Sequence, residues 1–178
     1  DLALGSGNYP DDSRVRIYRQ TVTRSFEEVT AAWGIDAGDG WHLAVEDFDR
    51  DGRLDLAAAA IRTPFHGRAA NRTYLWRNRL SPENHWVELL LEGASANRSA
   101  IGARVEVFAG GMRFCREVSS AAGHFGLAPP RTVHVGLGPV GGPLRVVVRW
   151  PDREGSTQTL EGLSADEVYV VRQGESPR

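Results

Sequence analysis

The acidic segment 47–55 constrains this chain more than any other stretch. Aspartates stand at positions 1, 3, 5 and 9 of the segment, and Gly52 stands at position 6. Carboxylates this close together repel each other unless a cation holds them, and hard oxygen donors in a flexible loop suit Ca²⁺. Gly52 permits the sharp turn that wraps such a loop around an ion. The expected ligands are the side chains of Asp47, Asp49, Asp51 and Asp55 and the backbone carbonyl of Arg53. The alternative is an acidic surface turn without a metal.

The residues that flank this loop indicate which kind of calcium site it forms. An EF-hand requires a glutamate at position 12 and a following helix, but position 12 is Ala58. The alanine-rich run Leu56–Ile61 is ambiguous by local propensity, because alanine favours helix. The short apolar run Trp41–Val45 ends at the loop and favours an extended strand. We therefore expect a strand–loop–strand unit in place of an EF-hand.

An internal repeat extends this interpretation. Asp1-Leu2-Ala3-Leu4-Gly5 resembles Asp55-Leu56-Ala57-Ala58-Ala59, and each copy is followed by a matching strand pattern, Arg16–Gln20 and Tyr74–Asn78. The period is roughly fifty residues, which is typical of β-propeller blades. Asp1 then occupies the position of Asp55, as the last carboxylate of a loop that begins upstream.

The sequence pattern changes near Ser81–Asn84. Beyond this point short β-rich runs alternate with turns of glycine, proline and aspartate, a pattern typical of a sandwich or a partly open barrel. We therefore divide the chain into residues 1–83 and residues 84–178. The strands expected in the second part are His85–Leu91, Ala103–Phe108, Arg113–Val118, Thr132–Leu137, Leu144–Trp150, Thr157–Leu160 and Val168–Arg172.

Both parts resemble known modules. The pattern Asp47-Phe48-Asp49-x-Asp51-Gly52-x-x-Asp55-Leu56 resembles the FG-GAP/VCBS repeat, the calcium-binding blade unit of integrin-type propellers. Residues 84–173 resemble the ASPIC/UnbV domain. In this order the two modules resemble the cartilage acidic protein 1 family. The second resemblance rests on Asn84-His85-Trp86, Asn97-Arg98, Ile101–Val105, Arg116-Glu117-Val118, His134–Gly138 and Val148–Asp152.

The resemblance implies an all-β chain, with a partial β-propeller followed by a β-sandwich. It also implies a secreted or periplasmic protein of the binding or adhesion type, in which structural Ca²⁺ fixes the loop and further N-terminal blades contact this one. Some bacterial relatives occur with enediyne natural-product pathways, which implies an alternative role as a cofactor-independent enzyme or accessory protein. A carbohydrate-binding module is a further alternative, and the ligand, protein or glycan, is left open.

Composition and residue patterns exclude several other classes of protein and of site. The net charge of −2 gives no field that favours nucleic acid. No apolar run reaches the length of about 18 residues that a membrane-spanning helix requires. The single cysteine, Cys115, excludes an internal disulfide and a cysteine-based zinc site, and its strand pattern predicts a half-buried thiol. No nucleophile, base and acid stand in a recognisable catalytic pattern, so we assign no catalytic residue.

Several conspicuous side chains have a plain structural interpretation. We expect the five tryptophans to pack in cores or between modules, with a sugar-stacking platform as the alternative. We expect Asn97 to shape a turn before Gly102 through local side-chain hydrogen bonds. The charged side chains of the second part are expected to be solvated strand faces and turn anchors, with a functional constellation as the alternative: Arg98, Arg104, Arg116, Glu117, Arg149 and Asp152.

Overall fold

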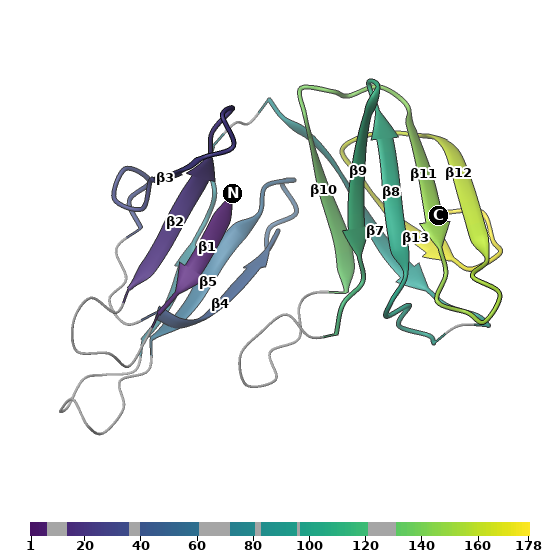
Figure 1. Ribbon diagram of the computed structural model, residues 1–178, viewed down its shortest axis with the longest axis horizontal. Helices are drawn as coiled ribbons and strands as arrows, with labels where there is room; N and C mark the ends of the chain where they lie inside the picture. The colour runs from purple at the N-terminus through teal and green to yellow at the C-terminus, as the bar shows by residue number, and fades with distance from the viewer. Residues whose placement is uncertain (7–13, 36–39, 61–71, 81–82, 96, 121–130) are drawn as a thin grey trace. The chain divides into compact units, whose positions relative to one another are not determined.

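The computed structural model describes residues 1–6, 14–35, 40–60, 72–80, 83–95, 97–120 and 131–178. Over these residues the chain is all-β, as the sequence predicts, and it contains four sheets (Figure 1). It divides into two compact units, which are described separately below. The first comprises residues 1–49 and 54–78, and the second comprises residues 50–53 and 79–178. The boundary expected at residue 83 stays a prediction, and Ser81 and Pro82 lie outside the described residues.

The first unit consists of two three-stranded antiparallel sheets, ordered β1-β2-β3 and β4-β5-β6. A shared core of Val15, Ile17, Val29, Leu56 and Ala58 joins them. This arrangement is consistent with FG-GAP blades. The strands are β1 (Leu2–Gly5), β2 (Val15–Gln20), β3 (Phe26–Glu28), β4 (Gly40–Glu46), β5 (Asp55–Ala60) and β6 (Arg72–Trp76).

The strand–loop–strand expectation for the acidic segment is confirmed. β4 ends at Glu46, β5 begins at Asp55, and Glu46 pairs directly with Asp55 in an antiparallel register. The alanine-rich run is therefore a strand as far as Ala60, and Ile61 lies outside the described residues. Alanine's helix propensity is weak, and pairing with β4 on one side and β6 on the other overrides it.

The second unit is a sandwich of two sheets, ordered β10-β7-β13 and β12-β11-β8-β9 (Figure 1). All seven predicted strands are present, with ends shifted by at most three residues. They are β7 (His85–Glu92), β8 (Arg104–Ala109), β9 (Met112–Glu117), β10 (Thr132–Gly138), β11 (Leu144–Arg149), β12 (Thr157–Leu163) and β13 (Glu167–Arg172).

Alternating side chains build the core of this sandwich. In β11, Leu144, Val146 and Val148 are buried, whereas Arg145 and Arg149 are exposed. Inward residues from both sheets form one cluster that excludes water, which is the main stabilising contribution. The largest member is the indole of Trp150, which is 2% exposed and donates from Nε1 to Gln158 Oε1 at 3.1 Å. The packing role predicted for this tryptophan is confirmed.

The prediction of a half-buried Cys115 is wrong. The residue lies in β9, as expected, but its thiol is exposed. It pairs with Glu106 of β8, and both lie on the face of the sheet opposite the core residues Val105 and Val107. Arg104 Nε donates to the sulfur at 3.2 Å. A single apolar residue in a strand does not show which face it occupies, because strand side chains alternate between faces.

Candidate metal centre

Three of the four loop aspartates come together. Asp47 and Asp49 follow β4, and Asp55 begins β5, so the β4–β5 hairpin places all three at one end of its sheet. Each offers a carboxylate oxygen, and these oxygens lie within 4.8 Å of one another. Asp47 and Asp55 are 8% and 3% exposed. Like charges at this separation in a partly dehydrated site repel strongly, so the cluster requires positive compensation.

The protein supplies part of this compensation to Asp55. Its Oδ2 accepts from the Phe48 N–H at 3.2 Å, which closes the loop across the hairpin. Its Oδ1 accepts from the Asn78 N–H at 2.7 Å, and the Asn78 side chain donates to the carbonyl of Leu54 at 3.1 Å. Asp55 thus fastens the segment that follows β6 to the start of β5. The spacing of the aspartates gives no signal for Asn78.

Arg77 supplies further compensation to Asp49. Its Nε lies 2.5 Å from Asp49 Oδ2, and both side chains are partly exposed. The internal repeat contains a signal for Arg77 and Asn78. They occupy the positions in the second copy that Arg19 and Gln20 occupy in the first.

The other two residues of the predicted ligand set, Asp51 and Arg53, bond to each other. Asp51 Oδ1 accepts from the Arg53 N–H at 3.0 Å, and the Arg53 guanidinium pairs with Asp51 Oδ2. The group of three carboxylates does not include Asp51. Gly52 has φ +86°, a left-handed conformation that costs glycine little, so the turn predicted at this position is present.

Hydrogen bonds and strand register support the internal repeat. Asp1 Oδ1 accepts from the Gln20 N–H at 2.9 Å, as Asp55 Oδ1 accepts from the Asn78 N–H. Leu2 pairs with Tyr18 in β2, and Leu56 pairs with Trp76 in β6. The first aspartate of each copy therefore has the same structural role.

The donor set fits a hard divalent cation. It consists of carboxylate oxygens alone, two of its members are buried, and their separation allows one ion to contact all three. Such ligands favour Ca²⁺ or Mg²⁺ over softer metals. When bound, the ion would neutralise the carboxylates and fix the loop between two strands.

Comparison with protein families identifies both modules. The model of the FG-GAP-like repeat matches residues 1–58, and the model named ASPIC and UnbV matches residues 93–178. The two matches confirm the predicted modules and their order, whereas the resemblance to the cartilage acidic protein 1 family stays a prediction. A comparison with curated proteins finds no match to the chain. FG-GAP repeats often bind Ca²⁺, and both modules are typical of extracellular adhesion and interaction proteins. Within the described ranges, no helix is long and apolar enough to cross a membrane.

Proposed function

Because the chain joins an FG-GAP-like repeat to an ASPIC and UnbV domain, we propose that it belongs to a secreted or periplasmic interaction protein whose first module is stabilised by Ca²⁺. The observation that carries the calcium part is the cluster of Asp47, Asp49 and Asp55 between β4 and β5. The interaction role draws on the module types. The metal holds the loop and takes no part in a reaction.

The ligand set suggests a moderate affinity. Asp47, Asp49 and Asp55 provide three carboxylates. Extracellular calcium modules of this kind bind with dissociation constants of about 10⁻⁴–10⁻³ M. Arg77 pairs with Asp49, so a calcium ion has to displace this guanidinium. This competition lowers the affinity for calcium further. We therefore expect a site filled at extracellular calcium levels and empty at cytoplasmic ones.

Calorimetric titration with CaCl₂ tests the proposal. The unaltered chain should bind one Ca²⁺ at a dissociation constant of about 10⁻⁴–10⁻³ M. Asp47→Asn should weaken binding by about 10-fold or more, because it removes the charge of a buried ligand. Glu161→Gln is the matched control, since it removes a carboxylate that pairs with Arg145 in the second unit. An unaltered chain that releases no heat with Ca²⁺, and whose melting temperature is the same in chelator, would refute the metal site.

A further inference from the structure

The second unit contains a polar recess that the calcium proposal leaves unexplained. It lies where β7 and β13 end side by side, since Glu92 of β7 pairs with Arg172 of β13. Its volume is about 380 Å³, within the range of small-ligand sites. Glu92, Arg98, Arg172, Gln173 and Glu175 line it, together with Gly93 and Ala94.

Gln173 cross-links the segments that line the recess. Its Oε1 accepts from the N–H groups of Ala94 and Ser95, both at 3.0 Å. Its Nε2 donates to Ser95 Oγ at 2.8 Å and to Asp152 Oδ2 at 2.7 Å. One side chain thus ties the loop after β7 to the end of β13 and to the turn after β11. Such cross-linking lowers the cost of ordering the site when a ligand binds.

The turn that carries Arg98 is fixed in the same way. Asn97 Oδ1 accepts from the Ile101 N–H at 2.8 Å, and Asn97 Nδ2 donates to the Ile101 carbonyl at 2.9 Å, which confirms the predicted turn. The Gly93 N–H donates to the carbonyl of Arg98 at 3.1 Å. The Arg98 guanidinium makes no hydrogen bond or ion pair within the part of the chain that the structure describes.

Both hydrogen-bond donors and hydrogen-bond acceptors line the recess. Arg172 Nε donates to Glu92 Oε2, and both side chains are partly exposed. This hydrogen bond, followed by the nearby charges of Arg172, Arg178 and Arg98, lowers the pKa of Glu92. The recess therefore offers an ionised acceptor at Glu92, a second carboxylate at Glu175 and guanidinium donors at Arg98 and Arg172.

This mixture restricts the class of ligand. The two carboxylates disfavour a bare anion, and the two guanidiniums disfavour a cation. A polyol can satisfy both donors and acceptors with its hydroxyl groups, and the planar guanidinium of Arg98 suits an acidic group. A sugar ring with one carboxylate meets both requirements, and a single ring suits the volume.

We propose that this recess binds a uronic acid unit of an acidic polysaccharide, with its carboxylate on Arg98 and its hydroxyls on Glu92 and Glu175. The inference rests on the proposed interaction role and gives it a class of partner. It uses only residues of the second unit, so its test is independent of the calcium site.

Titration with D-galacturonate, followed by the amide NMR signals of the full chain, tests the inference. Chelator is present throughout, so that calcium cannot bridge the sugar to the acidic loop. The signals of Gly93 and Ala94 should shift, with a dissociation constant on the order of 1 mM for one sugar unit. Galactose and acetate should each bind at least about 10-fold more weakly, because each lacks half of the recognised groups. Equal binding of acetate means a site for anions only, and equal binding of galactose means no role for the acid; either outcome overturns the proposal.

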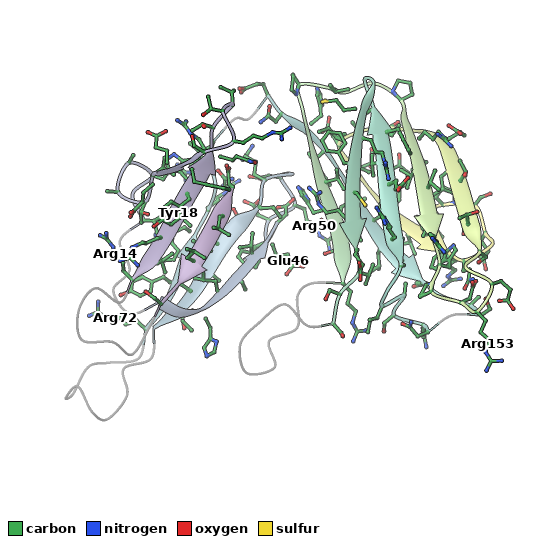
Figure 2. All side chains as sticks on the ribbon, viewed as in Figure 1. Arg14, Tyr18, Glu46, Arg50, Arg72 and Arg153 are labelled. Carbon is green, nitrogen blue, oxygen red and sulfur yellow. The ribbon has the colours of Figure 1, made fainter. Side chains whose placement is uncertain are left out.

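Two arginine variants separate recognition from general charge. Arg98→Gln should weaken galacturonate binding by about 10-fold, with an unchanged melting temperature. Arg153→Gln removes the same charge from the turn after β11, where the side chain points away from the sandwich (Figure 2), and should leave binding unchanged. If both variants weaken binding equally, or if galacturonate shifts no signal of the recess in the unaltered chain, the assignment is wrong. That unaltered-chain result stands even if Arg98→Gln fails to fold.

Discussion

At the scale of single residues, Asp55 has two roles that can be tested separately. It is a candidate metal ligand, and its buried carboxylate also satisfies the backbone N–H groups of Phe48 and Asn78. The second role needs no metal, so it persists in chelator. A buried donor that loses its partner is costly, because its hydration is not recovered.

Asp55→Asn should therefore destabilise the first unit even without calcium. The amide offers one acceptor where the carboxylate offers two, and hydrogen bonds to charged groups contribute about 1.5–3 kcal/mol each. We expect a loss of this size in the opening free energy of the β5 amides, measured by hydrogen exchange in chelator. Asp49→Asn should cost at most about 1 kcal/mol, since it breaks a partly exposed ion pair with Arg77. Equal losses from the two variants would contradict the anchoring role of Asp55.

Asp152 gives a prediction about pH. Hydrogen bonds from the Ser156 hydroxyl and then the Ser156 N–H, with a further one from Gln173, lower the pKa of this carboxyl below its ordinary value of 3.8. A depressed pKa in the folded state means that the stabilisation is complete above the unfolded value and disappears as pH falls through the folded one. Asp152→Asn should therefore lower the melting temperature at pH 7, with the difference shrinking below pH 3.8. Melting curves from pH 7 to pH 2 measure this, and a difference that grows in acid would contradict it.

Only part of the candidate metal centre could be predicted from the sequence. The spacing of the aspartates predicted the positions of Asp47, Asp49 and Asp55 at the β4–β5 hairpin, because one short loop connects them. The pairing of Asp51 with Arg53 was not predictable, since it depends on rotamers within the loop. Arg77 and Asn78 reach the site from the segment after β6, and only the comparison of the two repeat copies contains a signal for them.

The strands of the second unit were more predictable because their patterns are strict. Inward and outward residues alternate in β8 and β11, and the turns between strands carry glycine, so type and position follow from local sequence. Which strands pair with each other could not be predicted from the local sequence. β13 pairs in parallel with β7, and a register shift between Gly136 and Gly138 interrupts the pairing of β10 with β7. Both depend on contacts between residues far apart in the chain.

The central position of β7 gives a prediction at the scale of elements. Leu89 is fully buried in the middle strand of its sheet, between β10 and β13. Leu89→Ala should cost about 2–5 kcal/mol, from lost burial and the cavity left behind. Val168→Ala on β13 is the control, because Val168 is 43% exposed and its truncation should cost less than about 1 kcal/mol. Urea unfolding measures both variants, and a Leu89 variant as stable as the control would mean that the core repacks around the gap.

At the scale of the whole molecule, the described residues form two separate hydrophobic cores. One is built from β2, β5 and the residues around Val29, and the other from the two sheets of the sandwich. Among the described residues, the first core has fewer buried side chains than the second. The proposed calcium ion would act on the first unit, because Asp47, Asp49 and Asp55 all belong to it.

Calcium should therefore protect one unit and leave the other unchanged. A ligand that binds only the folded state stabilises it by RT ln(1 + [L]/Kd), so calcium at 100 times Kd contributes about 2.7 kcal/mol. We expect amides of β4, β5 and β6 to exchange more slowly by a corresponding factor of about 100 when calcium replaces chelator. Amides of β7, β8 and β11 should exchange at the same rate in both conditions, which makes them an internal control. Equal slowing in the two units would show that they unfold together, and no slowing in either would show that calcium does not stabilise the first unit. Slowing confined to β4–β6 is the outcome that follows from two cores and one metal loop.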